Sequence, residues 1–258
     1  MGSLWEDNCR APAIASLFHI MVEACFLDRM TAAPPPFDAA RVARAREDRV
    51  AAIAALEAGG PRDALEVLAG AATARALLDG VFGNSPFLTR AIIREVAFLA
   101  DLLARDPAET LNALLDDLRR DVDASPDMAD VSRLLRIARR RVAILVALAD
   151  IGGIWSLEQV TDALSALADA AIANALRFLL RRLGERGELA LADPGDPAHG
   201  SGLIVLGMGK LGARELNYSS DVDLIFFFDQ AVTPYRGSKT AQACLAAMVR
   251  DFVRLLQE

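Results

Sequence analysis

Apolar residues recur at helical spacing along the first 185 residues, and turn-forming residues divide this pattern into about eight segments without a fixed repeat. Asp38, Asp106 and Ser156 each stand directly before such a segment, where an N-cap residue is favoured. Pro61 suits the first turn of a helix, where its missing N–H is not needed. The pattern predicts helices over about 13–30, 39–58, 61–68, 72–82, 86–104, 107–124, 128–149 and 157–183.

The character of the chain changes after Gly184. Residues 187–192 fit a short strand or an extended connector, and the turn residues of 193–201 predict a surface loop. Two apolar runs, Leu203–Leu206 and Val222–Phe228, then predict strands, and a final helix is expected from about Ser238. The predicted class is α+β and mostly α, with a helical region at 1–190 and the start of an α/β domain at 191–258.

Composition supports packed helices and a soluble protein. The chain is 53% hydrophobic but only 6% aromatic, and its net charge of −7 argues against binding to nucleic acid. The amino-terminal residues lack the pattern of a signal peptide, and the apolar run 142–149 is far shorter than the roughly 20 residues of a membrane span. We therefore expect no membrane partner and a cytoplasmic location.

The cysteines and histidines do not predict a metal centre or a histidine-based catalytic triad. Cys9, Cys25 and Cys244 are isolated and show no metal-ligand spacing, and they do not form an even-numbered disulfide set. His19 and His199 are far apart in the sequence, and we interpret both as ordinary structural or surface residues.

The glycine-rich segment 207–212 is not a P-loop, because Ile204 stands in place of the first glycine and Leu211 in place of Ser or Thr. The same segment reads G-x-G-x-x-G, which is the dinucleotide fingerprint. Parallel strands need a crossover of a dozen or more residues, however, and only eight separate Gly212 from Asp221. The spacing therefore disfavours a dinucleotide-binding fold.

Two carboxylates, Asp221 and Asp223, stand where the second strand is expected to begin. Residues i and i+2 of a strand project from one face, about 6–7 Å apart. Two hard anionic ligands suit Mg²⁺ when substrate phosphates complete its coordination. A strand, a Gly-x pair (Gly209–Lys210), ten intervening residues and Asp-x-Asp is the spacing of a nucleotidyltransferase site. The alternative is a purely structural one, in which the segment is a capped hairpin with two surface aspartates.

The segment GMGKLGARELNYSSDVDLIFFFD at 207–229 resembles the signature of the adenylyltransferase that modifies and demodifies glutamine synthetase, a family of DNA polymerase β-like nucleotidyltransferases. GNSPFLTR at 83–90 and RRRVAILVALADIGGIWSLEQVTDALS at 139–165 are similar to its amino-terminal half. The resemblance implies that 191–258 begins a nucleotidyltransferase domain. It implies Mg²⁺ at Asp221 and Asp223, which are also the catalytic pair. It places nucleotide and phosphate groups near Gly207, Gly209, Lys210, Gly212, Ser219 and Ser220.

Enzymes of this family carry two such modules. One removes AMP from a tyrosine of glutamine synthetase by phosphorolysis and releases ADP, and the other attaches AMP from ATP. The sequence Arg214–Asn217, preceded by about 200 mostly helical residues, is similar to the removing module. The resemblance thus implies a Mg²⁺-dependent enzyme that acts on adenylylated glutamine synthetase and responds to a PII-type signal protein. The adenylylating module is the second reading.

The superfamily normally uses a third carboxylate on a later strand, and the sequence ends in the helix before it. Asp251 and Glu258 lie on that helix and are poor candidates. We therefore expect a fragment that is weakly active or inactive alone. A non-catalytic docking module with a remnant site is the competing reading.

Five arginines, Arg133, Arg136, Arg139, Arg140 and Arg141, gather on one predicted helix. They could receive an acidic partner or a phosphate. The favoured reading is a solvated helix face that pairs with the acids at 116–130.

Overall fold

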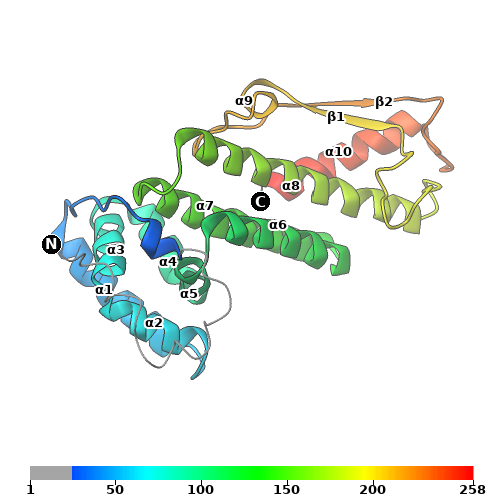
Figure 1. Cartoon of the computed structure of the whole chain (residues 1–258). Helices are drawn as coiled ribbons and strands as arrows, with labels where there is room; N and C mark the ends of the chain where they lie inside the picture. Colours follow the sequence, from blue (N-terminus) through cyan, green and yellow to red (C-terminus); the bar gives the residue numbers. More distant parts are fainter. Residues whose placement is uncertain (1–24, 258) are drawn as a thin grey trace. The chain divides into compact units, whose positions relative to one another are not determined.

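The computed structural model describes residues 25–257. This part of the chain is mostly helical, with one small sheet near its carboxyl end, as the sequence predicts (Figure 1). Most of the helix expected over 13–30 lies outside the described residues, as do Cys9 and His19. The elements in order are η1 (Phe26–Arg29), α1 (Ala39–Ala54), α2 (Pro61–Gly70), α3 (Ala72–Asn84), α4 (Pro86–Arg94), α5 (Val96–Ala104), α6 (Pro107–Ala124), α7 (Met128–Ile151), α8 (Leu157–Glu185), β1 (Leu203–Gly207), α9 (Gly209–Gly212), β2 (Leu224–Phe228) and α10 (Ala241–Gln257).

The chain divides into two compact units. Unit 1 runs from the amino-terminal part to Ala113 and includes Arg140–Leu157, and unit 2 comprises Leu114–Arg139 and Glu158–Glu258. The division falls inside α6 and α7, so each of these helices contributes to both units. The boundary expected at residues 190–191 lies between the end of α8 at Glu185 and the start of β1 at Leu203, and as a domain limit it stays a prediction.

The predicted helix starts are explained by local capping. The Asp38 carboxylate accepts a hydrogen bond from the backbone N–H of Arg41 at 3.0 Å, and the Ser85 hydroxyl accepts one from Leu88 N–H at 3.2 Å. Pro61 occupies the first position of α2, as expected. Each cap satisfies a backbone donor that has no partner inside its helix.

Several predicted helices differ in extent from the structure, and α10 for example begins at Ala241 rather than at Ser238. Helix α1 ends at Ala54 rather than near residue 58, and a turn leads to Gly59 and Gly60, which have positive φ. The single helix expected over 86–104 is broken at Glu95, whose backbone (φ −108°, ψ 35°) is not helical. The Glu95 carboxylate accepts hydrogen bonds from Arg140 Nε at 2.7 Å and Arg141 Nε at 2.9 Å. These long-range partners hold the break in place.

The arginine cluster of α7 pairs with acids, but only in part with the expected ones. Arg133 bonds to Asp130 at 2.7 Å, which is within the expected acidic stretch. Arg140 and Arg141 bind Glu95 instead. The interpretation as an ion-paired helix face is therefore correct for Arg133, and the expected acidic partners are wrong for the last two arginines.

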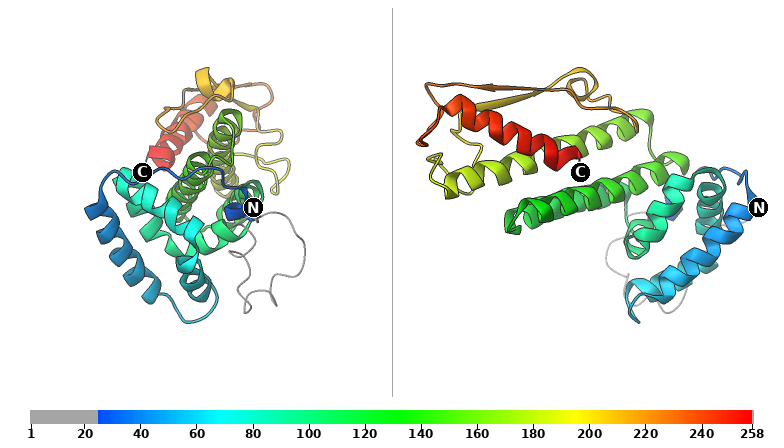
Figure 2. Two further views of the ribbon diagram at one scale, coloured as in Figure 1. Left: turned by 60° about the vertical axis from the view of Figure 1, so that its left-hand side comes forward. Right: turned by 180° about the vertical axis from the view of Figure 1, so that it is seen from behind.

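The core of unit 2 is built from the hairpin, from α8 and α10, and from the parts of α6 and α7 that belong to this unit. The β1–β2 hairpin lies over α10, and α10 lies beside α8 (Figures 1 and 2). Phe226 of β2 meets Phe252 of α10 edge-on, with ring centroids 5.2 Å apart. Phe178 of α8 and Met248 of α10 belong to the same buried cluster. The hairpin is thus fixed on helices through one of its faces.

Among the described helices, α8 is the one long and apolar enough to cross a membrane by length and composition. A helix in the core of a soluble protein passes the same test. Ala175, Phe178 and Leu183 of α8 are buried in the core of unit 2, and its Arg177 forms an ion pair with Asp123. We interpret α8 as a core helix.

Candidate functional site

The two strands that frame the candidate site are antiparallel. Leu203 pairs with Phe228 and Gly207 with Leu224, in a register without a bulge. This direction confirms that the segment does not begin a parallel dinucleotide-binding unit. The second strand begins at Leu224 rather than Val222, so Asp221 and Asp223 precede the strand instead of forming its first residues. The cause is the end of β1 at Gly207, which leaves little backbone for them to pair with.

The hairpin separates its side chains by face. Leu203, Leu224, Phe226 and Phe228 pack against the core of unit 2. The alternate residues Ile204, Leu206, Ile225 and Phe227 are 40–53% exposed. One face of the hairpin therefore anchors the site, and the other is apolar and open to solvent in this structure.

A tight turn follows β1. The Met208 N–H donates to the carbonyl of Asp223 at 2.9 Å, which adds one bond beyond the paired strands. Gly209 has φ 53°, a conformation that favours glycine, and a Cβ on Gly212 would lie 2.6 Å from the Gly207 carbonyl oxygen. Gly209 thus serves the left-handed backbone of the turn and Gly212 serves close backbone packing of α9 against the end of β1.

The loop after the turn is closed by its own side chains. Ser220 Oγ donates to Asn217 Oδ1 at 2.9 Å and accepts from Asn217 N–H at 3.0 Å, and Ser219 N–H donates to Asn217 Oδ1 at 3.2 Å. Both candidate phosphate-binding serines are therefore engaged in shaping the loop. Asn217 organises this loop, a role that its usual preference for turns suggests but does not specify.

The two aspartates and the lysine are exposed and available. Asp221, Asp223 and Lys210 are exposed, and within residues 25–257 none of their side chains has a hydrogen-bond or ion-pair partner. The Met208–Asp223 backbone bond brings the end of the acidic segment next to the glycine turn. The structure thus places Asp223 beside the start of the turn that carries Lys210.

The donor set fits Mg²⁺ that is shared with a substrate. Two unpaired carboxylates are the protein ligands that Mg²⁺ commonly uses when phosphates and water fill its remaining positions. The described residues contain no group of three or more His, Cys, Asp or Glu side chains arranged to hold a metal ion. Asp221 and Asp223 therefore suit a metal held together with a nucleotide better than a metal bound by protein alone.

Arg214 was not predicted as a functional residue, although it lies within the motif. Its backbone is left-handed (φ 58°), and its guanidinium bonds to Asp162 at 2.9 Å and to Asp169 at 3.2 Å. The hydrogen bond that Arg214 donates to Asp162 and the charges of both aspartates raise the pKa of Arg214 above its usual value. The spacing of seven residues between the aspartates, which puts them on one helix face, was the available signal.

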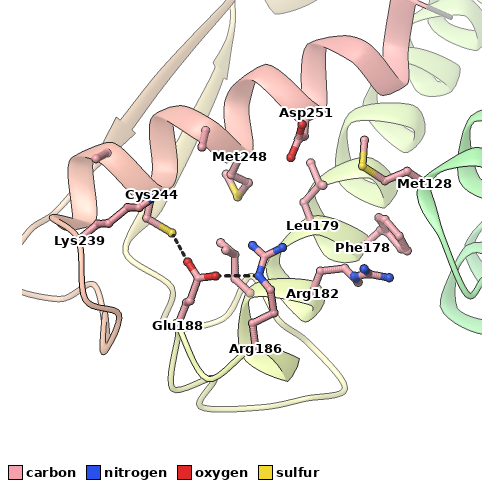
Figure 3. Close-up of a pocket in the computed structure, with 13 residues that line it drawn as sticks. Met128, Phe178, Leu179, Arg182, Arg186, Glu188, Lys239, Cys244, Met248 and Asp251 are labelled. Carbon is pink, nitrogen blue, oxygen red and sulfur yellow. Dashed lines mark hydrogen bonds and ion pairs between the residues drawn. The ribbon is translucent and has the colours of Figure 1, made fainter.

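A cavity of about 300 Å³ lies elsewhere in unit 2, between α8 and α10 (Figure 3). Phe178, Leu179 and Met248 form apolar parts of its wall, and the Cys244 thiol donates a hydrogen bond to Glu188 Oε2 at 3.1 Å. None of the predicted site residues lines this cavity. We therefore assign the candidate site to the strand ends.

Comparison with known proteins shows which family the segment with the candidate site resembles. The sequence model of the family described as glutamate-ammonia ligase adenylyltransferase matches residues 76–258. This range contains α8, the hairpin and all eight candidate residues. No solved structure matches the chain.

Several curated relatives carry the name bifunctional glutamine synthetase adenylyltransferase/adenylyl-removing enzyme. Those of Bradyrhizobium sp. (strain ORS 278), Xanthobacter autotrophicus and Bartonella quintana are 45%, 43% and 39% identical to this chain. The matches cover 71%, 71% and 70% of the chain, and 19%, 20% and 19% of the respective relative. The chain thus spans about a fifth of the length of these relatives. It belongs to the glutamate-ammonia ligase adenylyltransferase family.

Proposed function

We propose that the chain carries the nucleotide site of an adenylyl-removing module, which removes AMP from a tyrosine of adenylylated glutamine synthetase. The observation that carries the proposal is the pair of unpaired carboxylates, Asp221 and Asp223, beside the glycine turn. Family membership supports the substrate, since the relatives' names include both an adenylylating and an adenylyl-removing activity. The motif Arg214–Asn217 favours removal over addition.

In the proposed reaction, an oxygen of inorganic phosphate forms a bond to the phosphorus of AMP. The bond from that phosphorus to the tyrosine oxygen breaks, the tyrosine oxygen takes the proton that the attacking hydrogen phosphate gives up, and ADP leaves. Asp221 and Asp223 would hold Mg²⁺, and this ion would supply positive charge to the phosphates and the departing oxygen. Lys210 attracts a phosphate oxygen, and the glycine turn lets the backbone approach the nucleotide.

The proposed partners follow from the same reading. Adenylylated glutamine synthetase is the protein substrate, and a PII-type signal protein regulates the whole enzyme. The reaction takes place in the cytoplasm.

The proposal is tested by measuring ADP release from adenylylated glutamine synthetase in the presence of phosphate and Mg²⁺. The assay uses the chain itself and a protein of the relatives' length that contains it. In the longer protein, Asp221→Asn or Asp223→Asn is expected to lower the rate at least about a hundredfold, as does chelation of Mg²⁺. Asp121→Asn removes an exposed carboxylate of α6 and is expected to leave the rate unchanged.

The same assay separates the competing functions. Consumption of ATP with transfer of AMP to unmodified glutamine synthetase, lost in Asp221→Asn, would assign the chain to the adenylylating module. Unchanged activities of both kinds in Asp221→Asn and Asp223→Asn would leave the chain as a docking module and overturn the proposal.

A further inference from the structure

Arg214 is an unusual residue in the described part of the chain. It is the one non-glycine residue between 25 and 257 with a positive φ, at 58°. The left-handed region disfavours residues that carry a Cβ, so glycine would suit this backbone better. The presence of arginine therefore points to a use for its side chain.

That side chain connects the segment after α9 to α8. Arg214 Nε donates to Asp162 at 2.9 Å, and its Nη1 donates to Asp169 at 3.2 Å. The two aspartates are seven residues apart, which is two turns of a helix, so they lie on one face of α8. One guanidinium thus holds two points of the helix surface, which a single ammonium group does poorly.

The ion-paired Arg214 lies in the segment between the glycine turn and the two acids. Leu211 and Leu216 are buried on either side of Arg214, and the loop from Asn217 to Ser220 is closed by its own hydrogen bonds. Asp221 follows that loop directly. Between the glycine turn and the acids, the ion pairs of Arg214 are the charged connection to the helical part of unit 2.

We propose that Arg214 is a positioning residue, which fixes the segment 213–220 on α8 and so sets where Asp221 and Asp223 stand relative to the glycine turn. This inference rests on the proposed nucleotide site. Arg214 contacts no reacting group in this scheme, and it acts through the loop.

The exposure of Arg214 and its two aspartate partners indicates whether their ion pairs affect the stability of the fold or only the order of the loop. Arg214, Asp162 and Asp169 are 52%, 60% and 55% exposed, and exposed ion pairs contribute little to the stability of a whole fold. Their loss should therefore leave the unfolding temperature nearly unchanged. The ion pairs of Arg214 act on residues 213–220 together with buried Leu216 and the hydrogen bonds inside the loop, so the order of this segment should depend in part on them.

The test measures two quantities on the same variants of the full chain. The affinity for ADP in the presence of Mg²⁺ is determined by calorimetry, and the order of residues 213–223 is determined by hydrogen exchange without nucleotide. Arg214→Gln is expected to weaken binding about five- to tenfold and to speed exchange in this segment. Arg250→Gln removes an exposed arginine of α10 and is expected to change neither quantity.

Exchanging the charges of Arg214 and its two aspartate partners tests whether the lost binding can be restored. Arg214→Glu alone should weaken binding at least as much as Arg214→Gln, because it faces two aspartates. Combining it with Asp162→Lys and Asp169→Lys restores opposite charges and is expected to recover much of the affinity and of the exchange protection. Such recovery would support a positioning role, since the original side chains are all absent.

The other outcomes are distinct. Unchanged exchange in Arg214→Gln overturns the inference, whatever the affinity. Faster exchange with unchanged affinity also overturns it, because Arg214 then orders the loop without positioning the site. Absence of Mg²⁺-dependent ADP binding to the unsubstituted chain overturns the proposed function and the positioning role together, while the exchange data still show whether the ion pairs order the loop.

Discussion

Cys244 shows how one buried group couples to pH. Burial raises the pKa of its thiol from 9.0 to about 11, and the hydrogen bond to Glu188 and the charge of that carboxylate add to the effect. In the folded chain the thiol therefore keeps its proton at pH values where the same thiol in the unfolded chain has lost it.

This difference predicts the pH dependence of stability at high pH. The contribution of Cys244 is fully present below about pH 9 and is lost as pH rises toward about 11, because only the unfolded chain gains from deprotonation in this window. A raised pKa of this size corresponds to at most about 3 kcal/mol. Denaturant unfolding at intervals from pH 8 to pH 11 should show a shallower decline in Cys244→Ala than in the original chain, by no more than this amount. Equal declines would show that the Cys244 pKa is not raised.

Side chains of β2 alternate between the core and solvent, and this alternation determines how much a substitution lowers the free energy of unfolding. Phe226 faces the core and contacts Phe252, whereas its neighbour Phe227 is 50% exposed. Phe226→Ala should lower the free energy of unfolding by about 2–4 kcal/mol through lost burial and the cavity left behind. Phe227→Ala should cost less than about 1 kcal/mol, because little of its surface is removed from water. Comparable losses would contradict packing of the hairpin through the Phe226 face alone.

The break between α4 and α5 depends on a buried carboxylate. The side chain of Glu95 is 9% exposed and receives both Arg140 and Arg141. Glu95→Gln removes the negative charge and leaves two arginines poorly paired. It should lower the free energy of unfolding by about 1–3 kcal/mol, which is less than for a fully buried pair because the arginines reach solvent.

Fluorescence of Trp155, which is buried in unit 1, reports this unfolding in a Trp5→Phe background. Glu57→Gln changes an exposed glutamate of the same unit and serves as the matched control. An equal effect of the two substitutions would contradict the structural role of Glu95.

Across the whole chain, local signals predicted local structure well. Asp38 and Ser85 mark helix starts because a cap depends on residues three positions away, and the short spacing from Gly212 to Asp221 excluded a parallel crossover. The break at Glu95 was missed because its cause, two arginines 45 and 46 residues later, is not visible in a local pattern.

In the candidate site, too, local features were predicted and a long-range contact was missed. The motif predicted that a glycine turn and two acids lie together, and the Met208–Asp223 bond brings these segments side by side. The motif did not reveal that Arg214 binds Asp162 and Asp169, since that contact requires knowing which face of α8 meets the loop. Metal binding by the acids stays a prediction.

Ligand binding should stabilise the molecule only when metal and nucleotide are both present. Two carboxylates alone are a weak site for Mg²⁺, and a nucleotide alone brings negative phosphates toward Asp221 and Asp223. Mg²⁺ with ADP at about one hundred times its dissociation constant should add about 2.7 kcal/mol to the free energy of unfolding. The midpoint temperature of thermal unfolding, followed by circular dichroism, should therefore rise when Mg²⁺ and ADP are added together. It should change little when either is added alone. Asp121→Asn should keep this rise and Asp221→Asn should lose it, whereas a rise that survives in Asp221→Asn would place nucleotide binding elsewhere in the chain.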